Sequence, residues 1–278
     1  MNNLNKIPIH DSSLRHSTGQ AIYIDDMPEQ ENLLHGAPVL SKVACGKIKK
    51  INSDKLKDLC IRDRIITAKV IPGENEIGPI KNGEPILADD FFSYLGQPVA
   101  IVLAKTHQEA IYASSLVGIE LEFTTKPILN LDDAYEQKSF LEDPMILEKG
   151  NIKKDMSKSN YTLSGDFEIG GQDHFYLETH VAITFPGEND EYVVWSSTQH
   201  PTEVQHGVGK VLNIPSAKID SKVRRLGGGF GGKESQATIF AAMSALGAYL
   251  TQKPVKIRLN RHIDMTASGK RHDFKIYY

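Results

Sequence analysis

Hydrophobic and polar positions in the first part of the chain change repeatedly between a strand-like and a helix-like period. Short apolar or β-branched runs predict strands, and stretches with apolar residues three and four apart predict helices. These patterns place strands at residues 21–24, 38–44, 65–71, 98–103 and 119–123, and helices at 53–59 and 106–116. The helix at 106–116 has a defined start, because Thr106 and Glu109 have the spacing of a capping box. The alternation predicts a mixed α/β fold.

The periodicity fades between residues 126 and 159, where acidic residues and Pro144 are scattered among polar positions. Such a composition is typical of a connection that runs over the protein surface. We therefore expect a first α/β domain at residues 1–125, a connecting segment at 126–159 and a second domain at 160–278.

The second domain also alternates strands with helices. Its apolar runs predict strands at residues 161–169, 175–185, 192–197, 217–225, 255–259 and 273–278, and helices at about 201–212 and 237–250. Pro201 suits the first turn of a helix, and the small residues of the last helix suit close packing on a sheet. The final strand would leave aromatic side chains uncovered, so we expect the chain to be truncated or a fragment.

Composition narrows the classes of protein. The 278 residues are 40% hydrophobic and 24% charged, which is ordinary for a soluble globular protein. The 32 basic and 35 acidic residues are interspersed and give a net charge of −3, so neither nucleic acid nor a membrane is an expected partner. Cys45 and Cys60 lack a C-x-x-C spacing, which argues against a zinc or iron–sulfur site in this chain. The N-terminus lacks a signal-like apolar segment, so we expect a cytoplasmic protein.

Residues 225–234 form the most informative motif, Arg-Leu-Gly-Gly-Gly-Phe-Gly-Gly-Lys-Glu. Its five glycines lie between a predicted strand and a predicted helix and allow positive φ angles, so the motif predicts a binding loop. From Gly227 the motif matches seven positions of a phosphate-binding loop, Gly-x-x-x-x-Gly-Lys. The eighth position is Glu234 instead of Ser or Thr, and its carboxylate would repel a triphosphate, which disfavours an NTPase.

Three of the same glycines, starting at Gly227, also match a dinucleotide fingerprint, Gly-x-Gly-x-x-Gly. That site expects an acidic residue at the end of the next strand, where the chain has Asn260 and Arg261. A tight turn for close helix–sheet packing is the plain alternative. Phe230 distinguishes this loop from a phosphate-binding loop, a dinucleotide fingerprint and a plain tight turn. A large ring between glycines could stack on an aromatic ligand while main-chain amides face an oxygen.

With Arg224 and Arg225 before it, the glycine motif resembles the molybdenum-binding signature of xanthine dehydrogenases. Further stretches resemble that family in order and spacing: His10 and residues 16–19, 23–26, 88–90, 96–99, 170–179, 197–199 and 269–272. The resemblance covers essentially the whole chain, and several motifs in one order are more specific than a single glycine loop. It implies an N-terminal hammerhead-like α/β domain followed by the first part of a molybdopterin-binding domain.

In this family a molybdenum ion carried by a pterin dithiolene hydroxylates an electron-poor ring carbon, with oxygen from water and electrons passed to iron–sulfur clusters and FAD. The resemblance implies a molybdenum–molybdopterin cofactor, with hypoxanthine or xanthine converted to urate. It also implies a partner chain that carries [2Fe-2S] clusters and FAD in an oligomeric enzyme, in agreement with the low cysteine count here.

The resemblance implies four site residues. Gln199 resembles the glutamine whose amide donates to an oxygen on molybdenum, while Phe230 and Gly231 resemble a pair whose ring borders the substrate and whose backbone amide points toward the metal's oxo group. Glu234 would face the ring nitrogens and oxygens of a purine, whereas aldehyde-oxidising relatives tend to carry an apolar residue there. The pterin sulfurs, and no protein side chain, are implied to hold the metal.

Each residue also has a plain structural interpretation. Gln199 could cap the following helix, Phe230 could pack in the core, and Glu234 could stabilise the N-terminus of the next helix. His174 and Glu178 are four residues apart, but on a predicted strand they would lie about 13 Å from each other, too far to chelate one ion.

The family's catalytic base is a glutamate far along the molybdenum subunit, beyond the end of this chain, so the catalytic residue is unknown here. We therefore expect the isolated chain to be inactive toward xanthine. Two other functions stay open at this point: a molybdenum hydroxylase for an aldehyde or another N-heterocycle, and a non-catalytic truncated remnant that binds neither cofactor nor substrate.

Overall fold

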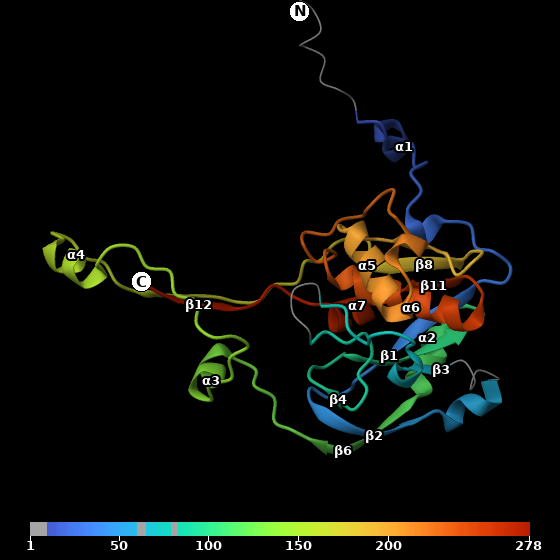
Figure 1. Ribbon diagram of the computed structural model, residues 1–278, viewed down its shortest axis with the longest axis horizontal. Helices are drawn as coiled ribbons and strands as arrows, with labels where there is room; N and C mark the ends of the chain where they lie inside the picture. Colours follow the sequence, from blue (N-terminus) through green and yellow to red (C-terminus); the bar gives the residue numbers. More distant parts are fainter. Residues whose placement is uncertain (1–9, 60–64, 79–82) are drawn as a thin grey trace, which may run out of the picture. The chain divides into compact units, whose positions relative to one another are not determined.

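The computed structural model describes residues 10–59, 65–78 and 83–278 (Figure 1). They pack into two units: the larger contains the chain up to Thr124 together with Phe175–Ser268, and the smaller contains Thr125–His174 and Gly269–Tyr278. Within the described residues the strands form a seven-stranded sheet, a three-stranded sheet and a two-stranded ribbon. With helices interleaved along the chain, this is the mixed α/β fold that the sequence predicts.

The main sheet combines strands that lie far apart in the sequence, in the order β10-β9-β8-β11-β1-β5-β3. Its strands are β1 (Leu34–Leu40), β3 (Ile65–Thr67), β5 (Pro98–Ala104), β8 (Val181–Pro186), β9 (Tyr192–Ser196), β10 (Ile219–Lys222) and β11 (Val255–Arg258). β1 is parallel to β11, with His35 opposite Lys256, and antiparallel to β5, with Gly36 opposite Leu103. The sheet therefore contains strands from both segments that were predicted as domains, residues 1–125 and 160–278. The bounds of these domains remain a prediction.

Strand β5 is buried on both faces, which explains why its sequence is an unbroken apolar run. Leu103 belongs to the core cluster that contains α6 (Gln236–Thr251), while Val102 on the other face belongs to the cluster that contains α2 (His107–Leu116). Small residues let α6 pack closely, because a side chain added at Gly247 would meet β11 at 3.2 Å. The predicted packing of this small-residue helix on a sheet is confirmed.

Two helix starts follow their local sequence signals. α2 begins after Thr106, whose side chain accepts from the Glu109 amide while the Glu109 carboxylate accepts from the Thr106 amide, so the predicted capping box is confirmed. α5 (Pro201–Leu212) has the proline at its first position and packs against α6. α7 (Arg261–Ala267) follows β11 and is capped by Asn260.

The second sheet has the order β4-β2-β6 and is antiparallel throughout. Its strands are β2 (Gly46–Asn52), β4 (Phe91–Phe92) and β6 (Gly118–Thr124). A small core cluster that includes Phe92 and Val99 packs against Ile48 and Leu121 of this sheet. Short helical segments complete the larger unit: α1 (Ser13–Ser17), η1 (Ile24–Asp26), η2 (Asp54–Leu59), η4 (Ala68–Val70) and η5 (Ser216–Lys218).

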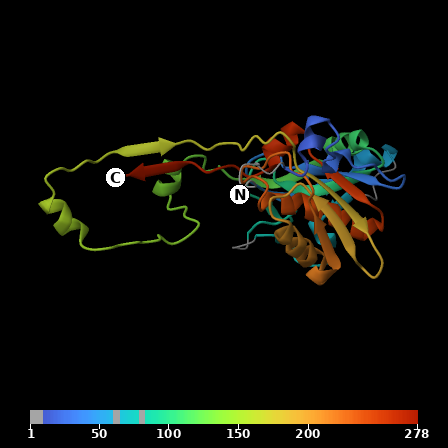
Figure 2. The same cartoon turned by 90° about the horizontal axis from the view of Figure 1, so that it is seen from above.

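The smaller unit holds two short helices and the two-stranded ribbon (Figure 2). These elements are α3 (Leu131–Glu136), α4 (Ile152–Lys158), β7 (Asp166–Ile169) and β12 (Phe274–Tyr277). Asn130 and Asn151 cap the two helices through their side-chain oxygens. Lys275 on β12 forms ion pairs with Asp132 and Glu168. The segment predicted as a surface connection therefore contains capped helices, with every helical residue exposed or half-exposed.

Several predicted strands differ from the structure. The strand at 21–24 is wrong, because this segment is irregular and leads into η1. The strand predicted at 175–185 begins only at Val181, since the preceding residues take part in side-chain contacts described below. The strand predicted at 65–71 ends at Thr67, where η4 takes over. Cys45 is half-buried and Cys60 lies outside the described residues. None of the described helices has the length and apolar character needed to span a membrane.

Candidate cofactor and substrate site

The glycine loop, residues 223–235, joins β10 to α6 and takes left-handed backbone conformations. The φ angle is +96° at Gly228, +53° at Phe230 and +88° at Gly231. A side chain at Gly229 would collide with the side chain of Gln199. Glycine is required where the backbone approaches so closely, whereas Phe230 adopts its conformation at a cost of roughly 1–2 kcal/mol. The loop therefore keeps an unfavourable conformation that places a phenylalanine at its tip.

Gln199 lies against this loop and is fixed at three points. Its backbone amide donates to the Lys233 carbonyl at 2.9 Å, and its side-chain Oε1 accepts from the amides of Gly231 at 3.0 Å and Lys233 at 3.3 Å. Two N–H donors require an oxygen at this position, so the side-chain NH2 group must occupy the other side of the amide. His200 occupies the N-cap position of α5, and the Gln199 side-chain oxygen accepts from loop amides instead of helix amides, so the interpretation of Gln199 as a helix cap is wrong.

The tip of the loop is open to solvent. Phe230 is 77% exposed, which is incompatible with the alternative that it packs in the core. Gly231 and Glu234 are also exposed, and Glu234 lies two residues before the start of α6. The structure thus brings Gln199 and Gly231 into contact and places Phe230 and Glu234 on the same loop. The Gly231 amide, implied to face a metal's oxo group, donates here to Gln199.

The base of the loop contains a buried ion pair. Lys233 is fully buried, and its Nζ lies 3.1 Å from Glu178 Oε2. The same carboxylate oxygen accepts from the Gly227 amide at 2.9 Å, and the Glu178 amide donates to the Gly227 carbonyl at 3.0 Å. Burial lowers the pKa of Lys233, an effect that the charge of Glu178 opposes. Because the lysine points into the interior, it cannot reach a phosphate as the lysine of a nucleotide-binding P-loop does.

A second polar network lies beside this pair. The Tyr176 hydroxyl donates to Asp264 Oδ1 at 2.6 Å and lies 3.0 Å from His180 Nδ1, and the His180 amide donates to Asp264 Oδ2 at 2.6 Å. Burial alone would raise the pKa of Asp264, but the hydrogen bonds from His180 and Tyr176 outweigh it and lower that pKa to about 2. Burial lowers the pKa of His180. The Tyr176 ring also lies under Lys233 Nζ, 4.6 Å from its centroid.

Arg261, at the start of α7, holds the segment that carries Glu178. Its Nη2 donates to the carbonyls of Tyr176 and Leu177, each at 2.6 Å, and its guanidinium lies 5.3 Å from the ring centroid of Phe175. Sequence reasoning missed the roles of Tyr176, Lys233 and Arg261. It rejected Glu178 as a metal ligand, on the basis of a strand that the structure does not form at this position, and otherwise included it only in the family-like stretch 170–179.

The start of the glycine loop contacts the N-terminal motif. The buried guanidinium of Arg225 donates to Ser12 Oγ at 3.2 Å and to the Ile22 carbonyl at 3.4 Å. A cavity of about 280 Å³ lies here, and its lining includes His10, His16 and Arg225. Two stretches that resemble the same family are therefore adjacent in the fold, although Ser12 and Arg225 are 213 positions apart in the sequence.

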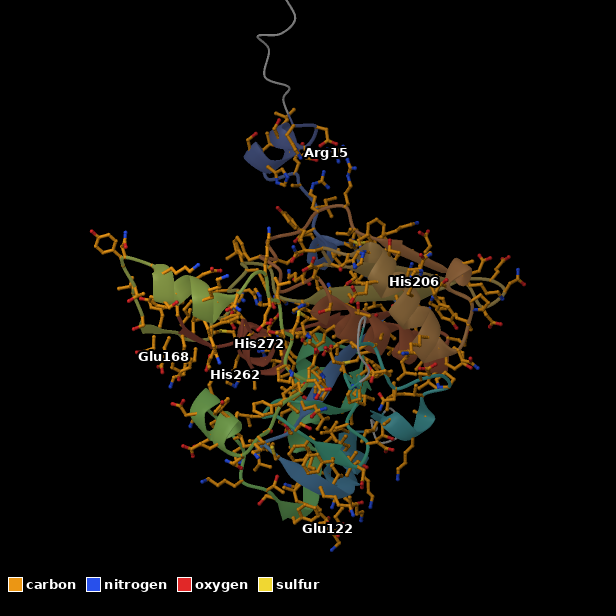
Figure 3. All side chains as sticks on the ribbon, turned by 60° about the vertical axis from the view of Figure 1, so that its left-hand side comes forward. Arg15, Glu122, Glu168, His206, His262 and His272 are labelled. Atoms are coloured by element: carbon orange, nitrogen blue, oxygen red, sulfur yellow. The ribbon has the colours of Figure 1, made fainter. Side chains whose placement is uncertain are left out.

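A larger cavity, of about 520 Å³, lies elsewhere. Its lining includes Glu74, His206 and Lys210, and it shares no residue with the glycine loop. Figure 3 shows His206 on α5. Within the described ranges, no group of three or more His, Cys, Asp or Glu residues is placed to hold a metal ion.

Two family models match the chain. A model of the molybdopterin cofactor-binding domain matches residues 136–278, and a model of the aldehyde oxidase and xanthine dehydrogenase a/b hammerhead domain matches residues 18–125. The glycine loop and Gln199 both lie within the residues that match the molybdopterin cofactor-binding domain. The chain belongs to the xanthine dehydrogenase and aldehyde oxidase family of molybdenum hydroxylases, as its motifs predict.

Similar curated proteins agree with this family. The chain is 37% identical over 272 residues to a xanthine dehydrogenase of Calliphora vicina, and 40% identical over 268 residues to a nicotinate hydroxylase of Emericella nidulans. These alignments cover 97% and 95% of this chain but 20% of each relative. The chain therefore spans about one fifth of the length of the curated relatives that it matches.

Solved structures show the same fold. An aldehyde oxidoreductase of Desulfovibrio gigas matches with a TM-score of 0.81 at 22% identity, over 96% of this chain and 31% of that structure. A quinoline 2-oxidoreductase of Pseudomonas putida 86 matches with a TM-score of 0.79, also at 22% identity, over 95% of this chain and 35% of that structure. The predicted combination of a hammerhead domain with molybdopterin-binding sequence is confirmed.

Proposed function

We propose that this chain forms one wall of the molybdenum site in a hydroxylase for N-heterocycles, with hypoxanthine or xanthine as the substrate and urate as the final product. The observation that carries the proposal is the geometry of Gln199. Its oxygen is held by two amides of the loop that carries the exposed Phe230, so its NH2 group is a donor of fixed orientation. Such a preorganised donor is what a site that handles a reacting oxygen requires.

The residues present fit a molybdenum–pterin group. Around Gly231, apart from its two chain neighbours, no heavy atom of the described residues lies within 4 Å of where a side chain would start, so the backbone there is open to close approach. The neutral amide of Gln199 offers a donor that does not titrate. When bound, the molybdenum–pterin group supplies the two-electron oxidation and the transfer of oxygen.

The chain's own residues would bind and orient the substrate. The Phe230 ring, exposed at the loop tip, would stack on a planar heterocycle, and Gln199 Nε2 would donate toward the cofactor. Glu234 would accept hydrogen bonds from the N–H groups of a purine. A base is also needed for hydroxylation, and no residue of the loop is proposed for this role.

The choice of a purine rests on charge. The names of the similar proteins include both xanthine dehydrogenase and nicotinate hydroxylase, and both xanthine and nicotinate are N-heterocycles. Nicotinate carries a carboxylate, which the carboxylate of Glu234 would repel, whereas a neutral purine would not be repelled. Another N-heterocycle is therefore the second candidate, and an aldehyde is disfavoured because an apolar residue would suit it better than Glu234.

The remaining parts of the enzyme are proposed from the family alone. We expect [2Fe-2S] clusters and FAD on a partner chain, an oligomeric assembly and a cytoplasmic location. The inactivity of the isolated chain also stays a prediction. Purification of this chain with its partners, followed by metal analysis and flavin absorbance, would test the expected cofactors.

Kinetics in a molybdenum-loaded enzyme that contains this chain would test the substrate. Xanthine, nicotinate and an aromatic aldehyde are compared as kcat/KM for the wild type and for Glu234→Val. We expect turnover of xanthine in the wild type, and a loss of roughly 100-fold in the variant, because a buried hydrogen-bonding group of the substrate loses its partner. Glu188→Val, at an exposed glutamate in a distant turn, is the matched control. Failure of the wild type to oxidise any N-heterocycle would contradict the proposed function.

A further inference from the structure

At Gly227, which is taken as the first end of the glycine loop, the backbone forms two hydrogen bonds with Glu178. The Glu178 amide donates to the Gly227 carbonyl at 3.0 Å, and the Gly227 amide donates to Glu178 Oε2 at 2.9 Å. The contact is close, because a side chain added at Gly227 would collide with Glu178. The backbone entering the loop is therefore tied to one carboxylate.

The second end of the loop is held by Gln199 and its neighbour. The Lys233 carbonyl accepts from the Gln199 amide at 2.9 Å and from the Thr198 hydroxyl at 3.2 Å, and the Lys233 amide donates to Gln199 Oε1 at 3.3 Å. The residue that closes the loop thus has both of its backbone polar groups engaged with the segment that carries Gln199.

The side chain of Lys233 joins the two ends. Its Nζ forms an ion pair with the same Glu178 oxygen that binds Gly227, at 3.1 Å, and lies over the ring of Tyr176. Lys233 is fully buried, and the Glu178 side chain is 13% exposed. An ion pair that is so well shielded cannot separate without leaving an uncompensated charge in the interior, so it fixes the distance between the two loop ends.

We propose that Lys233 is a positioning residue: through its buried pair with Glu178 it sets the spacing of the loop ends and thereby the orientation of the Gln199 amide. The link to catalysis rests on the proposed function of Gln199, whereas the link to loop geometry does not. Lys233 itself touches neither substrate nor cofactor in this scheme. It acts indirectly, because Gln199 Oε1 can accept from the amides of both Gly231 and Lys233 only while these two amides keep their relative positions.

Amide hydrogen exchange in the ¹⁵N-labelled 278-residue chain tests the proposal without cofactor. In Lys233→Met we expect hydrogen exchange to accelerate roughly tenfold or more at two backbone amides, that of Gly231 and that of position 233, because local opening of the loop becomes easier. The protected amides of α6 should change less. The separated signals of the Gln199 NH2 protons should also approach those of a freely rotating glutamine. Neither change depends on molybdenum, so failure here is distinct from failure of the proposed function.

A second buried lysine provides the matched control. Lys256 on β11 is 4% exposed and pairs with Asp25 and Glu29, each at 3.0 Å. Lys256→Met should destabilise the fold in a similar way but leave the exchange at Gly231 unchanged. The proposal is overturned if this control accelerates the loop amides as much as Lys233→Met does, or if Lys233→Met accelerates α6 and the loop equally.

A double variant separates positioning from bulk stability. Adding Glu178→Gln to Lys233→Met removes the unpaired carboxylate and keeps an acceptor for Gly227, so the free energy of unfolding should recover, but no ion pair joins the loop ends and loop exchange should stay within about threefold of that in Lys233→Met. Loop exchange that returns to the wild-type rate would overturn the proposed role of the ion pair. If Lys233→Met does not fold, Glu178→Gln alone provides the same readout: relative to the wild type, exchange should accelerate more at Gly231 than in α6.

Discussion

The tip and the base of the glycine loop are only a few residues apart, yet their environments are opposite. At the tip, Phe230 is 77% exposed, and Glu234 is exposed as well, while at the base Lys233 is fully buried against Glu178. Exposed side chains contribute little to folding, so those at the tip are free to be chosen for ligand contact. Those at the base carry the stability that keeps the tip in place. Substitutions in the two regions should therefore separate stability from substrate binding.

The largest effect is expected from breaking the buried pair. Lys233→Met should lower the free energy of unfolding by about 3–5 kcal/mol, because it leaves the Glu178 carboxylate buried without its cation. Replacing both residues by methionine should recover much of this loss, because no unpaired charge remains. Urea denaturation measures the free energy of unfolding of the single and the double variant. Lys210→Met, at a partly exposed lysine paired with Glu74, should cost less than about 1 kcal/mol, and an equal loss in this control would remove the distinction.

Adding a methyl group at a glycine of the base and at a glycine of the tip tests the same difference between the two regions. Gly227→Ala at the base should cost about 3 kcal/mol, because the new methyl group collides with Glu178 and the core must shift. Gly231→Ala at the tip meets no atom of the described residues within 4 Å and should cost only about 1 kcal/mol, which arises from its positive φ. Thermal unfolding of the two variants side by side gives the difference. Equal losses would show that the base is able to relax.

The network beside the base should be visible as a pH dependence. The pKa of Asp264 is lowered from 3.8 to about 2 in the folded protein, so its contribution is complete above pH 3.8 and is lost as the pH falls through 2. The loss should be on the order of 2 kcal/mol. Unfolding free energies measured from pH 5 to pH 2 should fall less steeply in Asp264→Asn. A wild-type slope in Asp264→Asn would contradict the assignment.

The smallest effect on stability is expected at Phe230. Phe230→Ala should change the free energy of unfolding by no more than about 0.5 kcal/mol, because the ring is mostly exposed. In a loaded enzyme the same variant should raise KM for a planar heterocycle, because the stacking surface is lost. A large loss of stability in the chain alone would show that the ring has a packing role.

Local sequence signals predicted the elements whose starts depend on neighbouring residues. The capping box at Thr106 and the proline at residue 201 gave the starts of α2 and α5, because a cap acts within one turn. The caps of α3 and α4 at Asn130 and Asn151 carried a similar signal, which was overlooked in a segment interpreted as a loop. The periodicity of residues 175–180 suggested a strand, but polar side-chain contacts determine the backbone there.

The candidate site was predictable only in part. Glycine spacing and the resemblance to a family indicated the loop, Gln199 and Phe230. The pair Lys233–Glu178 joins residues 55 positions apart and Tyr176–Asp264 joins residues 88 positions apart, so neither leaves a local pattern. Burial made these contacts strong, and burial at a given position is a property of the whole fold. The sequence therefore indicated what the loop could bind before the structure showed what holds it.

The position of β1 in the main sheet has a consequence for synthesis on the ribosome. β1 lies between β5, which follows within about 60 residues, and β11, which follows about 215 residues after β1. At about 5–20 residues per second, one edge of β1 waits roughly 10–40 s for its partner. During that time the nascent chain exposes an apolar strand edge that could pair with other chains. The order of synthesis therefore leaves this edge of β1 open to wrong pairing until β11 has been made.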